Sequence, residues 1–158
     1  MIEDEVAQLL KLRRLTISAA EACTAGLIGY MLTKAPGSSR YFIGGVTAYA
    51  NSVKQGVLGA PEALLKERGA VSREVALAMA HGVRRLMSTD IGVSATGIAG
   101  PTGGTPERPV GSFFIAIATS SGVEACEEHR WNGDRLANKE RAAQAALSLV
   151  KRYLLEEL

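Results

Sequence analysis

The spacing of apolar and polar residues along the chain predicts helices and strands in alternation. Apolar positions at helical spacing predict helices at residues 2–13, 27–33, 61–68, 72–87 and 134–158. Runs rich in β-branched and aromatic residues predict strands at residues 16–20, 41–50, 90–95, 112–118 and 123–131. The last two strands are joined at residues 120–122, as in a hairpin. This order predicts an α/β fold, a single domain over residues 1–158 with a mixed sheet and helices on both faces.

The same periodicity predicts which side chains face the core. The residues expected to face inward are Val6, Leu9, Leu10 and Leu12; Val75, Met79, Val83 and Leu86; and Leu136, Ala143, Ala146, Leu147, Val150 and Leu154. Ser72 and Asp134 are expected to cap the helices that follow them. Gly44 and Gly45 inside a predicted strand indicate a bulge or a close backbone approach.

Composition narrows the class of protein. The 158 residues suit one domain, and a net charge of +2, from 18 basic and 16 acidic residues, gives no electrostatic reason to expect binding to nucleic acid or a membrane. Cys23 and Cys126 lack a CxxC spacing, and His81 has no ligand-type neighbour, so neither zinc nor a disulfide is expected. With no membrane-length apolar run and an acidic N-terminus, we expect a cytoplasmic protein.

A glycine-rich loop at residues 94–111, SATGIAGPTGGTPERPVG, follows one predicted strand. It admits two interpretations. It is either a long surface turn or a ligand-binding loop, in which threonine hydroxyls and bare backbone amides bind an oxyanion such as phosphate. A second stretch, EACTAG at residues 21–26, joins a strand to a helix. It is either an ordinary connection or an anion site at a helix N-terminus.

Three stretches directly follow predicted strands: the connection at residues 21–26, residues 51–54 after the second strand, and residues 96–104 of the glycine-rich loop. Ligands of open α/β sheets bind beyond the carboxyl ends of the strands. We therefore expect the three stretches to converge on one pocket.

Six short motifs carry a resemblance to a known family. They are AEACTAG (20–26), PGSSRYF (36–42), AYANSVK (48–54), GAVS (69–72), TGIAGPTGG (96–104) and GDR (133–135). In order and spacing they resemble the CinA C-terminal domain family over almost the whole chain. Stand-alone members of that family are nicotinamide-nucleotide amidases of pyridine nucleotide salvage, which convert nicotinamide mononucleotide to nicotinate mononucleotide and ammonia. The resemblance implies a small-molecule nucleotide ligand, no metal or other cofactor, and a homodimer.

The family's first motif reads AESCTGG, and the resemblance makes its serine the nucleophile, activated by a lysine with a tyrosine nearby. Lys54 and Tyr49 match that lysine and tyrosine, whereas Ala22 stands at the serine position. Ala25, Ala50 and Lys139 also depart from the pattern, the last standing for an arginine. Because a methyl group cannot attack a carbonyl, amidase activity is in doubt.

The resemblance and the loop chemistry together indicate a substrate-binding set. Its members are Cys23, Thr24, Gly26, Asn51, Thr96, Gly97, Gly100 and Arg135. A phosphate group suits Thr24 and the amides after it, or the Thr96 loop, with Arg135 as charge partner. Cys23 is either a replacement nucleophile or a small buried hydrophobe, and Thr24 is either a ligand contact or a helix cap.

Three functions follow from these residues. The chain is an amidase-like enzyme, a nucleotide-binding pseudoenzyme, or an interaction module that keeps only the fold. Retention of Lys54, Tyr49 and the glycine-rich loop favours the first two.

Overall fold

The computed structural model describes all residues 1–158 and contains six α-helices, one 3-10 helix and five strands. In chain order these are α1 (Ile2–Arg13), β1 (Ile17–Glu21), α2 (Leu27–Leu32), η1 (Ser38–Arg40), β2 (Phe42–Thr47), α3 (Asn51–Gly56), α4 (Glu62–Arg68), α5 (Arg73–Met87), β3 (Ile91–Gly97), β4 (Ser112–Thr119), β5 (Glu124–Arg130) and α6 (Arg135–Leu154).

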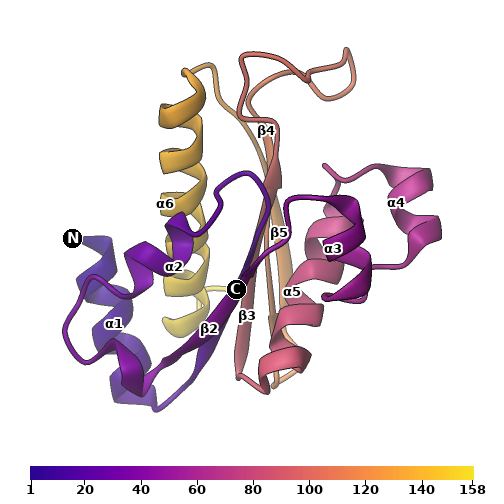
Figure 1. Cartoon of the computed structure of the whole chain (residues 1–158). Coiled ribbons are helices and arrows are strands. Elements are labelled where there is room, and N and C mark those ends of the chain that lie inside the picture. The colour runs from indigo at the N-terminus through magenta and orange to yellow at the C-terminus, as the bar shows by residue number, and fades with distance from the viewer.

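The strands form one mixed sheet in the order β2-β1-β3-β4-β5. β1 pairs in parallel with β2 and β3, whereas β4 is antiparallel to both β3 and β5. Figure 1 shows α1, α2 and α6 on one face of the sheet and α3, α4 and α5 on the other. The predicted mixed sheet with helices on both faces is confirmed.

The core lies on both faces of the sheet. The larger cluster packs strand residues such as Ile17, Val93 and Ile115 against α1, α2 and α6, while Met79 and Val83 of α5 pack on the other face. Small residues let α5 approach closely, since a Cβ on Gly92 would lie 2.2 Å from the Ala80 carbonyl oxygen. Close packing of this kind holds α5 against the middle of the sheet.

The glycine pair in β2 matches both expectations for it. The register between β1 and β2 shifts by one residue, because Ile17 pairs with Phe42 and Ser18 pairs with Gly44. A Cβ on Gly45 would lie 2.9 Å from the Ala19 carbonyl oxygen. A bulge thus bends this edge strand, and the backbones approach closely beside it.

Two predicted caps are confirmed, and one strand ends earlier than predicted. The side-chain oxygens of Ser72 and Asp134 accept hydrogen bonds from the amides of Val75 and Ala137, at 3.3 and 2.8 Å. β2 stops at Thr47 rather than at residue 50 because Ala50 is already the extended N-cap residue of α3. Only the Ala48 amide still bonds to β1, through the Glu21 carbonyl oxygen at 2.8 Å.

Three leucines predicted to face the core are exposed instead. Leu12 is 80% exposed because it lies two residues, about 200° of helix rotation, from the buried Leu10. Leu86 is 53% exposed because Met87, four residues after the buried Val83, takes the position against the sheet. Leu136, at 63%, lies in the first turn of α6, where it lines a surface hollow.

Candidate active site

The ends of β1, β2 and β3 meet around one small hollow of about 170 Å³. From the predicted set it is lined by Ala22, Cys23, Tyr49, Asn51, Lys54, Thr96 and Gly97, and also by Ala70 and Val71. The three stretches that follow the parallel strands therefore do converge. Ala70 and Val71, from the connection between α4 and α5, were not predicted as site residues, although they belong to the GAVS motif that contributes to the family resemblance.

The convergence follows from the strand pairing. Glu21, the last residue of β1, lies opposite Thr47 of β2 and Ala95 of β3. The ladder continues one residue further, where the Ala22 amide donates to the Ala95 carbonyl oxygen at 3.0 Å. Beyond this point β1 and β2 leave the sheet, while β3 continues beside β4 as far as Gly97, so the three strands end at the same edge of the sheet.

Lys54 is a buried amine in the wall of this hollow. The residue is 2% exposed, and its Nζ donates a hydrogen bond to the Tyr49 carbonyl oxygen at 3.0 Å. No carboxylate pairs with it. Burial lowers the pKa of Lys54 below its ordinary value, because desolvation penalises the charged form. Its free amine is therefore more populated than that of an exposed lysine.

Cys23 shares the hollow but is a poor nucleophile. Burial raises the pKa of its thiol to about 11, although the nearby Lys139, Arg135 and Lys54 oppose this shift. The thiol is therefore protonated at neutral pH. This environment favours the interpretation of Cys23 as a small buried hydrophobe, and it lies in the larger core cluster.

Thr24 and Gly26 lie at a second hollow, of about 330 Å³, with Tyr30, Leu136 and Lys139 among its lining residues. Thr24 is not the cap of α2; Gly26 occupies that position, in a left-handed conformation. The Thr24 hydroxyl is buried and has no hydrogen-bond partner. A cap at Thr24 was therefore a wrong expectation, because the turn needs a glycine where the helix begins.

The anion site considered at the start of α2 is already filled by the protein itself. The carboxylate of Glu21 accepts hydrogen bonds from the amides of Ile28 at 2.8 Å and Gly29 at 3.1 Å. Glu21 is buried, and its charge suits the positive end of a helix. The interpretation of these amides as a phosphate site is thus wrong. Glu21, the acidic residue that opens the EACTAG stretch, was the sequence signal that could have revealed that the protein caps this helix itself.

Arg135 ties two loops together beside the hollow. Its guanidinium donates to the Gly100 carbonyl oxygen at 2.6 Å and to the Tyr49 hydroxyl at 3.1 Å. Gly100 does not line the hollow, and Tyr49 is 60% exposed. Thr96 donates to the Ala70 carbonyl oxygen at 2.8 Å, so its hydroxyl keeps only acceptor capacity toward a ligand.

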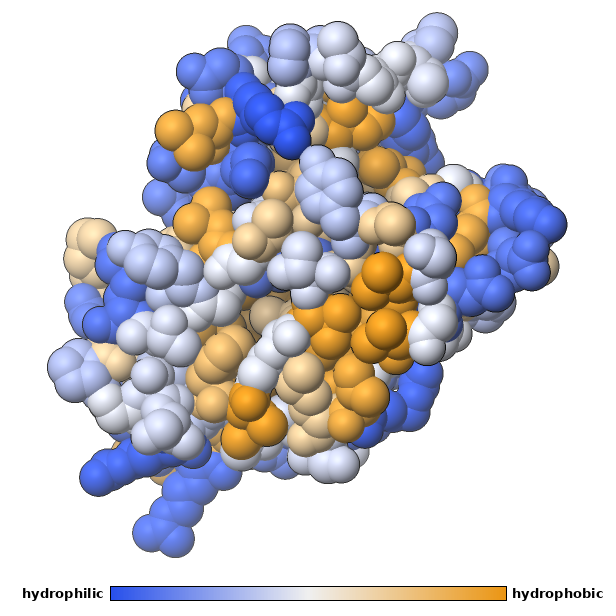
Figure 2. Space-filling model, in the orientation of Figure 1, coloured by the Kyte–Doolittle hydropathy of each residue, from blue (hydrophilic) through white to orange (hydrophobic).

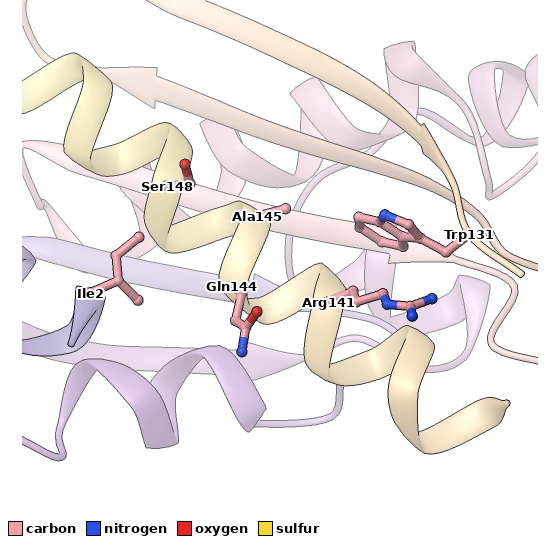
Figure 3. A pocket seen from close by; sticks show the side chains of 6 residues that line it. All are labelled: Ile2, Trp131, Arg141, Gln144, Ala145 and Ser148. Carbon is pink, nitrogen blue, oxygen red and sulfur yellow. The ribbon is translucent and has the colours of Figure 1, made fainter. Parts of the chain in front are cut away.

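A larger hollow, of about 430 Å³, lies away from these residues on the outer side of α6. Figure 3 shows Trp131 and Arg141 toward one end of it and Ile2 and Ser148 toward the other. Its one hydroxyl, on Ser148, has no base among the residues lining the hollow. Figure 2 shows apolar side chains gathered over β2, α3 and α5. Ile43 in β2 and Val57 at the end of α3 are exposed apolar residues of two of these elements. Neither surface has the chemical groups of the small hollow.

No cluster of three or more histidine, cysteine, aspartate or glutamate side chains is placed to hold a metal ion. None of the helices combines the length and the apolar character that crossing a bilayer requires.

The model of the CinA C-terminal domain matches residues 1–154. The chain belongs to the CinA C-terminal domain family. A CinA-like protein of Salinibacter ruber is 50% identical over 153 residues, which are 97% of this chain and 37% of that protein. A CinA-like protein of Desulfotalea psychrophila is 48% identical, with the same shares covered. The chain thus spans little more than a third of the length of these curated relatives.

Solved structures of this family have the same fold. The competence/damage inducible protein CihA of Agrobacterium tumefaciens superimposes with a TM-score of 0.91 at 35% identity, covering 94% of this chain and 93% of that one. A CinA superfamily protein of Klebsiella pneumoniae gives a TM-score of 0.93 at 26% identity, covering 98% and 96%. The fold resemblance therefore extends over nearly the whole CinA C-terminal domain.

Proposed function

We propose that this CinA C-terminal domain binds a nicotinamide nucleotide in the small hollow, with amidase-type geometry but without the hydroxyl nucleophile. One observation carries the proposal: Ala22 and Lys54 line the same hollow as Thr96 and Gly97. A serine at position 22 would place its hydroxyl in the hollow that contains a desolvated lysine. That is the pairing by which a lysine of lowered pKa activates a serine.

The size of the hollow favours one orientation of the nucleotide. A volume of about 170 Å³ suits the pyridine carboxamide, so the ribose and phosphate would extend outward. Arg135 and Lys139 are close enough to Cys23 to act on its thiol electrostatically, and they supply positive charge for the phosphate. The amides of Ile28 and Gly29 are unavailable, because they bond Glu21.

Amide hydrolysis with Ala22 in place would require another nucleophile. Cys23 is the adjacent candidate, but its thiol has a pKa of about 11, which leaves little thiolate at neutral pH. We therefore infer binding with little turnover rather than ordinary amidase activity.

The test is a calorimetric titration with nicotinamide mononucleotide beside an assay of ammonia release. Saturable binding with little ammonia is the expected result. Turnover at an ordinary enzymatic rate would mean that another nucleophile acts. Absence of both binding and turnover would overturn the proposal in favour of an interaction module.

A further inference from the structure

β2 forms an open edge of the sheet, where only β1 pairs with it. Its exposed positions are Ile43, Gly45 and Thr47. Alternate residues of a parallel strand bond to its neighbour, and the Ala48 amide bonds to β1 through the Glu21 carbonyl oxygen. The main-chain N–H and C=O groups of Gly45 and Thr47 therefore point away from β1 and have no partner strand.

This edge carries no charge. β2 reads FIGGVT, and from Phe42 to Ala60 the only charged residue is Lys54, which is buried. Unpaired strand edges are usually protected by charged side chains, by proline or by a bulge. The bulge of β2 lies at its start, and from Gly44 to Thr47 the strand pairs with β1 in regular register. The second half of the edge is thus both regular and unprotected.

The opposite edge of the sheet, formed by β5, is protected. β5 reads EACEEHR, so most of its side chains are ionisable. Its three carboxylates contact His81, Arg130 and Arg152 of the same chain. A strand added at β5 would have to desolvate these charges, which is costly. The two edges of the sheet therefore differ in their capacity to accept another strand.

Apolar side chains lie beside the open edge, on the face of the sheet that α5 covers. Ile43 of β2 is 52% exposed. Val46 of β2, Val53 of α3 and Met87 of α5 are only partly buried in the apolar cluster on this face. Figure 2 shows apolar side chains gathered over these three elements. A strand bound at the edge covers part of this surface and removes it from water.

We propose that β2 is an interface at which a second copy of this chain adds its own β2 in antiparallel orientation. A two-fold axis perpendicular to the sheet produces this arrangement and joins the two sheets into one. The free main-chain groups of Gly45 and Thr47 then gain hydrogen-bond partners. The α5 faces of both copies lie on the same side of the joined sheet, so their apolar surfaces adjoin. The inference does not depend on nicotinamide nucleotide binding.

A second copy fits this edge for reasons of charge and symmetry. No like charges meet, because β2 contains no charged residue in either copy. Pairing β2 with β2 closes both open edges at once and stops at two chains. Pairing β2 with β5 would instead leave a free edge at each end and generate a filament, and the charges of β5 oppose it.

Sedimentation velocity of the whole chain over a range of concentrations tests the association. A dimer that dissociates on dilution is expected, and a monomer at every concentration would overturn the proposal. Ile43→Lys should raise the dimer dissociation constant by about tenfold or more, because each copy loses buried apolar area and gains a like charge at the edge. A dimer that this substitution leaves intact would also overturn it.

Leu12→Lys is the matched control, because Leu12 is an apolar residue, 80% exposed, on α1. It should leave the dissociation constant unchanged. If Leu12→Lys weakens the dimer as much as Ile43→Lys does, the copies do not associate specifically through β2.

Amide hydrogen exchange on the unmodified protein, followed by NMR, tests the strand pairing directly. The amides of Gly45 and Thr47 should exchange more slowly at concentrations where the dimer is populated than after dilution to the monomer. A dimer in which both amides exchange as fast as in the monomer would show that β2 is not paired. This measurement decides even if Ile43→Lys fails to fold.

Discussion

The carboxylate of Glu21, at the end of β1, accepts a hydrogen bond from the amide of Ile28, in the first turn of α2, at 2.8 Å. A second bond, from Gly29 at 3.1 Å, completes the cap. The turn between these residues carries Ala22 and Cys23 into the hollow. One buried carboxylate therefore both satisfies a helix N-terminus and fixes one wall of the candidate site.

Replacing Glu21 should destabilise the fold. Glu21→Gln keeps one acceptor but turns an amide donor toward a main-chain N–H, so we expect a loss of about 1–3 kcal/mol in the free energy of unfolding. Glu67→Gln, on an exposed face of α4, is the matched control and should change it by less than about 0.5 kcal/mol. Urea denaturation of both variants measures the difference. Equal stability of the two would contradict the capping role.

Ala22→Ser should create or raise amidase activity toward nicotinamide mononucleotide. In a serine hydrolase, loss of the serine nucleophile lowers turnover by a factor on the order of 10⁶. A rate about 10³ to 10⁴ times that of the uncatalysed reaction in water survives, because substrate binding and oxyanion stabilisation remain. Ammonia release by the two proteins, at matched concentration, is the measurement.

The activity of the Ala22→Ser variant should depend on Lys54 as well as on the new serine. Ala22→Ser combined with Lys54→Ala should lose about 10²- to 10⁴-fold relative to the single variant, because a positioned base is removed. If the double variant keeps the full activity, Lys54 does not act as the base. If unmodified protein already turns over at an ordinary rate, Cys23→Ala is the next substitution.

The nucleotide should bind more tightly than the corresponding nucleoside. The phosphate adds charge-assisted hydrogen bonds, which are about twice as strong as neutral ones. Lys139→Met should narrow the gap between the two affinities, since Lys139 contributes positive charge near Cys23. Calorimetry with both compounds, on both proteins, provides the comparison. The same affinity for nucleotide and nucleoside would show that phosphate is not recognised.

Lys54 should make stability depend on pH on the alkaline side. Its pKa is lowered in the folded protein, so between the folded and unfolded pKa values the unfolded chain binds the extra proton. Stability therefore rises with pH through that window, which lies below 10.5, the ordinary pKa of a lysine. Lys54→Met should remove this rise. Thermal unfolding of both proteins from neutral pH to pH 10 measures it, and parallel curves would contradict it.

The sequence by itself determined the α/β class, the mixed sheet and the three stretches that meet at the site. Glycine, proline and capping residues such as Ser72 and Asp134 act locally, so their effects can be predicted from neighbours in the chain. The carboxyl-end rule for parallel strands then brings Ala22, Lys54 and Thr96 together without further information. The family motifs point to the same residues.

Only the tertiary structure decided which polar groups remain free for a ligand. The helix N-terminus offered amides in the sequence, but the buried Glu21 occupies them. Arg135 could be expected near a phosphate, yet two of its contacts are with Gly100 and the Tyr49 hydroxyl. Exposure of Leu136 and burial of Lys54 likewise depend on which elements pack nearby. Hydrogen-bond partners and burial are set by residues distant in the sequence, so they cannot be predicted from the local sequence pattern.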